Sequence, residues 1–177
     1  MKYSLAEEEV WQKALSVDDD DTLLSLLSDG LDSNTRFRCF IFKDNPILDF
    51  SPTLLCVCSF YNSKKCFNIL INEGADPALT DTTGNPPHTF AVAGGSGDIL
   101  GILCNLHPVK SSVLFTAVEN HQKHIFFWLW VTQPVNLKIR DSSGRTLLHS
   151  AVKGRNKHLT DFLFEELLPD LAVTDML

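Results

Sequence analysis

The 177-residue sequence lacks an apolar run long enough to cross a lipid bilayer. Its longest apolar run, residues 125–131, has seven residues, whereas a membrane-spanning helix needs about 20. The first ten residues carry Glu7, Glu8 and Glu9 and lack the basic and apolar segments of a secretory signal peptide. We therefore expect no membrane insertion.

Positive charge is also scarce. The chain has 15 Lys and Arg residues against 22 Asp and Glu residues, a formal net charge of −7 and a pI near 5.2. Because nucleic-acid binding requires a basic face that neutralises phosphates, we do not expect direct contact with nucleic acid. A protein partner fits this charge, and a basic one is the easiest to accommodate.

Catalytic and disulfide patterns are missing as well. The sequence contains no G-x-S-x-G, G-x-G-x-x-G, Walker or H-E-x-x-H motif, so we expect neither an enzyme nor a cofactor. An odd number of cysteines without the spacing of a secreted disulfide framework favours a reducing compartment, the cytoplasm or the nucleus. The five cysteines are Cys39, Cys56, Cys58, Cys66 and Cys104.

What the sequence does contain is a repeat, clearest in residues 141–170. Gly144 follows Asp141 in a predicted tight turn, where glycine accepts a positive φ without steric cost. Thr146 stands at a helix start, where its hydroxyl can accept a hydrogen bond from a free backbone N–H. Ala151 is small enough to let a neighbouring helix approach, and residues 159–163 carry the apolar stripe of a second helix.

This pattern recurs along the chain with unequal spacing. The position that Thr146 occupies is filled in order by Glu9, Thr53, Pro86, Ser112 and Thr146, at spacings of 44, 33, 26 and 34 residues. We expect one array whose repeats span approximately residues 5–33, 48–80, 81–107, 108–140 and 141–170, with an insertion at 34–52. A period near 33 residues is typical of stacked helix pairs that bury their apolar faces against each other.

Three motifs carry a resemblance to a known family. They are the turns Asp81-x-x-Gly84 and Asp141-x-x-Gly144, the helix start Thr146-Leu-Leu-His149-x-Ala151, and Gly74-Ala75-Asp76. Together they resemble the ankyrin repeat family, over a stretch from about Glu7 to Leu168. The resemblance implies an all-α fold, an ankyrin-repeat solenoid of stacked antiparallel helix pairs with β-hairpin-like loops. It also implies a non-enzymatic adaptor, scaffold or inhibitor, in which His149 is structural.

The same resemblance implies that a partner protein contacts the hairpin tips and the inner face of the first helices. Phe60 and Tyr61 are the strongest of these positions, because aromatic side chains often dominate binding energy, although packing against the first repeat is the alternative. The expected partner-binding residues are Phe60, Tyr61, Thr82, Thr83, Asn85, Glu119, Asn120, Ser142, Ser143, Arg145 and Lys153.

The repeat is irregular in three places. The insertion includes residues 36–43, which are Phe-rich and strand-like, and it is either an elongated hairpin folded back on the first two repeats or a recognition loop. The 26-residue spacing leaves room only for a tight turn at residues 105–111. His88 stands where an apolar residue is expected, which predicts weaker local packing.

Some clusters have a second interpretation. Cys56, Cys58 and Cys66, with His88 or His121, form a candidate metal or redox set, but their spacing is not that of common zinc sites and buried cysteines often act as small hydrophobes. A cysteine-based redox or metal sensor is therefore the alternative function.

Three further segments have a plain structural interpretation. We expect residues 125–131 to fill the core rather than a ligand pocket, His121 and His124 to be solvent-exposed, and residues 18–21 to form a solvated turn rather than a calcium site. Residues 170–175 resemble the start of another hairpin, so a segment of a longer ankyrin array is another alternative.

Overall fold

The structure is a computed structural model that describes residues 3–38, 42 and 45–174, with side chains up to residue 167. Within these residues it has ten α-helices, one short 3₁₀ helix and no β-strand, so the predicted all-α class is confirmed. The chain forms two compact units, Met1–Pro108 and Val109–Leu177. The boundary between them falls in the segment 105–111, where the repeat spacing is shortest.

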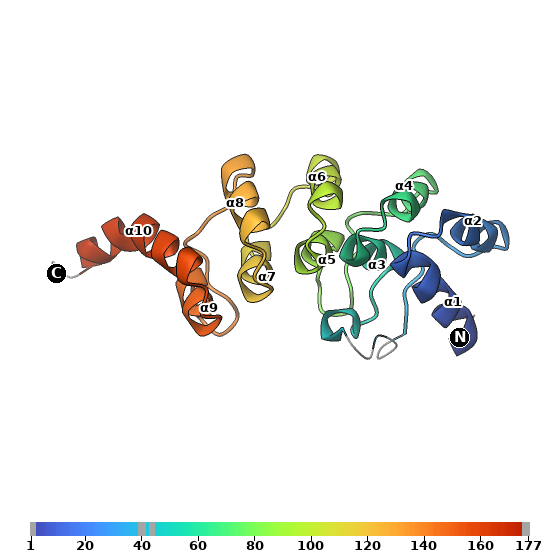
Figure 1. The fold of residues 1–177 in the computed structure, drawn as a ribbon, viewed down its shortest axis with the longest axis horizontal. Helices are drawn as coiled ribbons and strands as arrows, with labels where there is room; N and C mark the ends of the chain where they lie inside the picture. Colours follow the sequence, from blue (N-terminus) through green and yellow to red (C-terminus); the bar gives the residue numbers. More distant parts are fainter. Residues whose placement is uncertain (1–2, 39–41, 43–44, 175–177) are drawn as a thin grey trace. The chain divides into compact units, whose positions relative to one another are not determined.

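The first unit contains three helix pairs. They are α1 (Leu5–Ser16) with α2 (Asp20–Ser28), α3 (Leu54–Tyr61) with α4 (Lys64–Asn72), and α5 (Pro87–Gly94) with α6 (Gly97–Leu106), and the 3₁₀ helix η1 (Pro46–Leu48) lies between the first two pairs. The first helices α1, α3 and α5 pack side by side, and α2 packs against α4 (Figure 1). The core of this unit therefore lies between two rows of helices.

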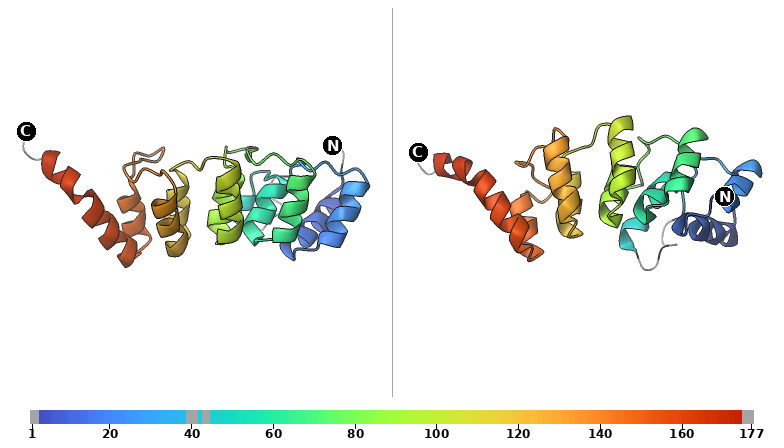
Figure 2. Two further views of the ribbon diagram at one scale, coloured as in Figure 1. Left: turned by 90° about the horizontal axis from the view of Figure 1, so that it is seen from above. Right: turned by 45° about the horizontal axis from the view of Figure 1, so that its top comes forward.

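The second unit contains two helix pairs, α7 (Val113–Glu119) with α8 (Lys123–Thr132) and α9 (Leu147–Lys153) with α10 (Lys157–Thr174). Here α7 packs against both α8 and α9, and α9 packs against α10. The long helix α10 extends well beyond α9 in both views of Figure 2. The prediction of a new hairpin at residues 170–175 is therefore wrong for residues 170–174. The helix α10 continues past Pro169 to Thr174, and Leu171 and Ala172 in this segment have high helix propensity.

All five helix pairs share one backbone turn. The first helix of each pair is followed by a residue with a positive φ of 52° to 78°, and these residues are Asp18, Asn62, Gly95, His121 and Arg155. Their spacings of 44, 33, 26 and 34 residues are those found in the sequence. The next residue donates its backbone N–H to the carbonyl five positions earlier, at 2.8–3.0 Å. Those carbonyls belong to Ala14, Cys58, Ala91, Ala117 and Ala151, the small residue of each copy. This bond is the Schellman pattern of a helix C-terminus.

Hydroxyl groups link neighbouring helix pairs in the first unit. The buried side chain of Ser63 donates a hydrogen bond to the carbonyl of Leu15 in α1. One pair later, the buried Ser96 donates to the carbonyl of Phe60 in α3, at 3.3 Å. Each serine follows a positive-φ residue, so the turn that ends one first helix is tied to the end of the first helix before it.

Side-chain caps start α3 and α9. Thr53 accepts a hydrogen bond from the N–H of Cys56 at 3.2 Å, and Thr146 accepts one from the N–H of His149 at 3.4 Å. In return, Nδ1 of His149 accepts from the N–H of Thr146 at 3.2 Å, which completes a capping box. His149 thus has a structural contact at the start of its own helix.

The insertion is packed against the first helix. Phe37 and Phe42 are each 1% exposed, and the ring of Phe37 lies 6.0 Å from that of Trp11 and 5.1 Å from that of Phe42 between centroids. This confirms the folded-back interpretation for these two phenylalanines. Only an isolated antiparallel bridge between Arg36 and Thr53 forms among the described residues of the predicted strand. Residues 39–41 and 43–44 lie outside the described residues.

The aromatic residues of α8 fill the core of the second unit. Phe126 is fully buried, and the ring of Phe162 in α10 lies 4.9 Å from Phe127 and 4.7 Å from Trp130 between centroids. Edge-to-face contacts at these distances are favourable. The core-filling prediction is confirmed for these residues and is wrong for Trp128 and Val131 of the same helix, which are 37% and 73% exposed.

Two polar residues of the first unit make specific contacts, and the first of them corrects a prediction. Asp18 is not part of a merely solvated turn, because its carboxylate accepts the backbone N–H groups of Lys65 and Cys66 at 3.2 and 3.0 Å. His88 is 2% exposed, and its Nε2 lies 3.1 Å from the carbonyl oxygen of His107. The buried ring thus has a polar partner, and weaker packing around His88 stays a prediction.

Candidate functional site

Two turns with the same bonding precede helices α5 and α9. In residues 81–85 the N–H of Asp81 donates to the carbonyl of Asn85 at 2.9 Å, and in residues 141–145 the N–H of Asp141 donates to that of Arg145 at the same distance. Each aspartate carboxylate accepts from the backbone N–H groups two and four residues later, at 2.8–2.9 Å. Gly84 and Gly144 have φ of 88° and 77°, as the sequence predicts.

The predicted tip residues of the first turn already make internal hydrogen bonds. Both the N–H and the hydroxyl of Thr82 donate to the carbonyl of Phe50 in the insertion, at 2.9 and 2.8 Å. The side chains of Thr83 and Asn85 donate to the Asp81 carboxylate at 2.8–3.2 Å. Thr82 and Thr83 are nevertheless exposed, so they present methyl and hydroxyl surface to solvent.

Phe60 and Tyr61 lie at the end of α3 and are both half-buried. Their rings meet edge to face with centroids 5.1 Å apart, and Nδ2 of Asn45 donates to the Tyr61 hydroxyl at 3.3 Å. A Cβ added to Gly94 of α5 would overlap the carbonyl oxygen of Phe60. The two rings therefore pack against each other, Tyr61 contacts Asn45 of the insertion, and the backbone of Phe60 lies against α5, so only the remaining side-chain surface is open to a partner.

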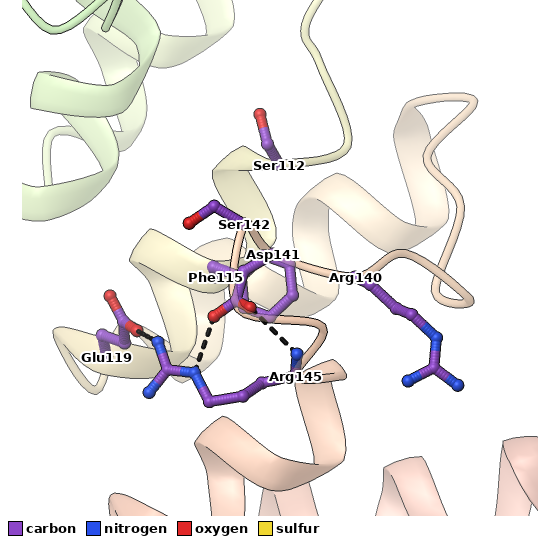
Figure 3. A pocket seen from close by; sticks show the side chains of 7 residues that line it. All are labelled: Ser112, Phe115, Glu119, Arg140, Asp141, Ser142 and Arg145. Atoms are coloured by element: carbon purple, nitrogen blue, oxygen red, sulfur yellow. Dashed lines mark hydrogen bonds and ion pairs between the residues drawn. The ribbon is translucent and has the colours of Figure 1, made fainter.

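A hollow in the second unit brings three of the predicted partner-binding residues together. It has a volume of about 410 Å³ and lies between α7 and the turn before α9 (Figure 3). Glu119, Ser142 and Arg145 line it, as predicted for a tip and a helix end. The remaining lining residues are Ser112, Phe115, Arg140 and Asp141.

Ion pairs organise the hollow. Nε of Arg145 lies 2.7 Å from a carboxylate oxygen of Asp141, and its Nη2 lies 3.9 Å from Oε1 of Glu119. Burial raises the pKa of Asp141, but the hydrogen bonds from Arg145 and Ser143 outweigh it and hold that pKa below its ordinary value. Figure 3 shows the Arg145 guanidinium beside both carboxylates, whereas the side chain of Arg140 points away from them. Nη1 of Arg140 donates to the carbonyl of Gly144 at 2.8 Å.

The other predicted residues of this unit lie outside the hollow. Asn120 is exposed at the end of α7, and its Nδ2 donates to the carbonyl of Thr116 at 2.9 Å. Ser143 is exposed in the turn, and Lys153 is exposed at the end of α9. His121 and His124 are also exposed, as predicted. In the first unit, Tyr61 accepts a hydrogen bond from Asn45 of the insertion, whereas Thr82 of the Asp81 turn donates to the carbonyl of Phe50.

Sequence reasoning missed four of the residues that line the hollow. The sequence identifies Ser112 only as a helix-start position, and nothing in the sequence indicates that Ser112 or Phe115 lies beside the Asp141 turn. Arg140 directly precedes that turn, so its position next to a predicted tip was the one available signal. Asp141 was identified as a turn residue and not as the anion that holds Arg145.

The candidate metal cysteines are enclosed by protein. Cys56, Cys58 and Cys66 are fully buried, and Oγ1 of Thr53 lies 3.2 Å from the sulfur of Cys56. Burial raises the pKa of Cys56 and of Cys66 to about 12, and that of Cys58 well above its ordinary value. These groups are therefore held as neutral thiols, the form that neither attacks electrophiles nor binds metal well. In the part of the chain that the structure describes, no group of three His, Cys, Asp or Glu residues is arranged to hold a metal ion.

Comparison of the sequence with protein-family models finds no match, and comparison with curated proteins finds none either. Among the described residues, no helix is long and apolar enough to span a membrane. Any functional assignment therefore depends on the repeated turns and on the side chains that they bring together.

Proposed function

We propose that the chain is an ankyrin-type repeat array and that it acts as a non-enzymatic module that binds another protein. The repeated turn after each first helix supports this proposal, because five copies of one backbone bond at the sequence-derived spacing indicate five copies of one structural unit. The paired turns at residues 81–85 and 141–145 support the hairpin-like loops of that family.

The observation that carries the proposed binding role is the hollow beside the Asp141 turn. Its lining combines the nearly buried ring of Phe115 with hydroxyls and charged groups at the edge. Protein interfaces commonly combine an apolar centre with a polar rim that fixes orientation. A partner side chain placed in the hollow would meet the exposed edge of Phe115 and the hydroxyls of Ser112 and Ser142.

The charged groups of the hollow favour recognition over proton transfer. A catalytic acid or base works best with a pKa near the working pH. The pKa of Asp141 is instead lowered, and the Arg145 guanidinium is held against its carboxylate. Such a pair stays charged at neutral pH and offers fixed hydrogen-bonding groups to a partner.

The buried neutral thiols agree with residence in the cytoplasm or the nucleus, where cysteines remain reduced. We include that compartment in the proposal.

Site-specific photocrosslinking tests the proposal. A benzophenone amino acid placed at Ser142, at the edge of the hollow, should crosslink a discrete protein in lysate. The control position is Asp161, which is exposed in the same unit but lies on α10 outside the hollow. We expect a crosslinked band at position 142 and none at position 161.

A matched substitution then checks the role of the ion pair. Arg145→Ala should remove the band at position 142 without unfolding the unit, since the Asp141 carboxylate keeps its hydrogen bonds from the backbone N–H groups of residues 143 and 145. Crosslinks that are equally strong at both positions, or that survive Arg145→Ala unchanged, would show that the hollow is not the binding site.

A further inference from the structure

The short turns between the two helices of each pair carry charge in a regular pattern. In the first unit, lysines stand two and three residues after the positive-φ residue Asn62. Lys64 forms an ion pair with Asp98 at 2.9 Å, and Lys65 forms one with Asp20 at 3.0 Å. Asp20 and Asp98 occupy the equivalent turns of the neighbouring pairs, so the cations of this edge are neutralised within the unit.

The same edge of the second unit is basic. Lys123 follows His121 by two residues, and Lys157 follows Arg155 by two residues, at the positions equivalent to Lys64. We call Lys123, Lys153, Arg155 and Lys157 the basic edge. Within the described residues, none of these four side chains forms an ion pair, and three of them are exposed while Lys123 is half-buried. His124 and His158 extend the edge and are exposed.

The nearest acidic side chains do not neutralise the basic edge. Glu119 lies one turn before Lys123 in sequence and faces Arg145 instead, at 3.9 Å. Asp161 follows Lys157 by four residues on α10 and makes no ion pair with it among the described contacts. In a chain with a net charge of −7, this edge is a local reversal of sign.

The two turns that form the basic edge are neighbours. A Cβ added to Gly154 would lie 3.7 Å from Cε1 of His121, so the turn after α7 contacts the end of α9. The rings of Phe127 and Phe162, in the helices that follow these turns, are 4.9 Å apart. The two turns that carry the four cations are therefore in contact within the unit.

Lysines at these positions are placed where they cost stability. Lys123 is the first residue of α8 and Lys157 the first residue of α10, and neither helix has an acidic residue in its first turn. The free N–H groups of a helix start favour negative charge, so a cation there is unfavourable. Those N–H groups add to the positive potential of the basic edge.

The backbone conformation of Arg155 is a second feature that lowers stability. This residue has φ of 52°, a conformation that glycine adopts more easily, and Gly95 fills the equivalent place in the third pair. Replacing Arg155 with glycine should therefore not strain this turn.

We propose that the basic edge binds an acidic, extended segment of the partner protein, rich in Asp or Glu. This inference rests on the proposed function in taking the partner to be a protein, and it adds the chemistry of the segment. Packed helices lie about 8–10 Å apart, and an extended chain rises about 3.3 Å per residue. Acidic side chains spaced three residues apart can therefore reach both turns.

A protein segment fits the edge better than nucleic acid does. Nucleic acid carries charge along its whole length and would meet the surplus acidic groups of this chain within roughly a Debye length of about 8–10 Å. A short acidic segment can end where the basic edge ends. The comparison of an acidic peptide with an oligonucleotide distinguishes these two classes of partner.

Fluorescence anisotropy of the full chain with three labelled probes tests the inference. The first probe is a peptide with glutamate at every third position between glycine and serine, the second has glutamine in place of glutamate, and the third is a single-stranded oligodeoxynucleotide of equal charge. We expect the glutamate peptide to bind about tenfold or more tightly than the glutamine peptide, and binding to weaken as salt rises. Tighter binding of the oligonucleotide than of the glutamate peptide would overturn the assignment to a protein segment.

Matched variants locate the binding. K153Q/R155G/K157Q removes three cations of the basic edge and places glycine at the positive-φ position, so its melting temperature should not fall. We expect it to lose about tenfold or more in affinity for the glutamate peptide. K64Q/K65Q removes the paired lysines at the same kind of turn in the first unit and should change affinity by less than about twofold. Equal effects of the two variants would refute the proposed site.

The two proposals fail separately. If the crosslink at position 142 persists while the basic-edge variant still binds the glutamate peptide normally, the binding module stands and the acidic-segment inference is wrong. If the glutamate peptide binds at the basic edge but position 142 yields no crosslink, the proposal that a partner binds in the hollow is wrong. The inference that the basic edge binds an acidic segment is then still supported.

Discussion

The carboxylate of Asp18 accepts a hydrogen bond from the backbone N–H of Cys66 at 3.0 Å, across 48 residues of sequence. Its second oxygen accepts from the N–H of Lys65 at 3.2 Å. Asp18 belongs to the turn between α1 and α2, and the two N–H groups belong to the first turn of α4. An aspartate of one helix pair thus caps a helix of the next pair, which explains how the insertion between them leaves the pairs in contact.

Asp18→Asn tests this cap. Asparagine also tolerates a positive φ, but it has one acceptor oxygen and no charge, so the free energy of unfolding should fall by about 1 kcal/mol. Urea denaturation monitored by circular dichroism measures the change. The control is Asp21→Asn in the same acidic run, where the side chain is exposed and we expect a change within about 0.5 kcal/mol. Equal losses in the two variants would show that general charge, and not the cap, is responsible.

His88 makes the stability of the first unit depend on pH. Burial is the main cause that lowers the pKa of His88 below its ordinary value of 6.5, and the carbonyl of His107 only partly offsets it. The folded state therefore holds fewer protons on this residue than the unfolded state. Stability from His88 is fully present above about pH 6.5, and it is lost as the pH falls below that value.

Thermal melting between pH 8 and pH 5 measures this effect, and His88→Leu provides the comparison. Leucine is the apolar residue that the repeat pattern favours at this position, and it cannot gain a proton. We expect the wild-type melting temperature to fall more steeply than that of the variant over this range. Parallel pH profiles for the two proteins would mean that other groups dominate.

The sequence was sufficient to predict local features of the fold. Gly144 and Thr146 mark a turn and a helix start through their own backbone preferences, and both occur where expected. The contact of Asp18 with Cys66 was missed because nothing in a run of four aspartates indicates which one faces a distant helix. The hollow was predicted only in part, since the position of Phe115 beside Asp141 depends on how α7 packs against α9.

The small residue that ends each first helix should tolerate alanine and resist larger side chains. Cys58 occupies the place that Ala14, Ala91, Ala117 and Ala151 fill in the other pairs, and it is fully buried. Cys58→Ala should cost about 1 kcal/mol or less, whereas Cys58→Leu should cost about 1–3 kcal/mol because the added atoms have no space. Chemical denaturation of the two variants gives both values. Similar stability for both would indicate a loose core at this position.

Gly94 should be the least replaceable glycine of α5 and α6. A Cβ at this position would overlap the carbonyl oxygen of Phe60 in the neighbouring helix α3, and a backbone atom cannot move aside as a flexible side chain can. Gly94→Ala should therefore lower the free energy of unfolding by about 1–3 kcal/mol, through the shift of α5 away from α3 that it forces. The measurement is urea denaturation, with the fluorescence of the single tryptophan of the first unit, Trp11, as a second probe of that unit.

Gly101→Ala is the matched control for that substitution. Gly101 lies inside α6, and a Cβ there would meet no atom within 4 Å. Since alanine has the higher helix propensity, this change should raise the free energy of unfolding by about 0.5–1 kcal/mol. The two substitutions add the same methyl group to neighbouring helices, so opposite signs can only come from the close approach of α5 to Phe60. Stabilisation by Gly94→Ala would mean that α3 and α5 are farther apart in solution than in the structure.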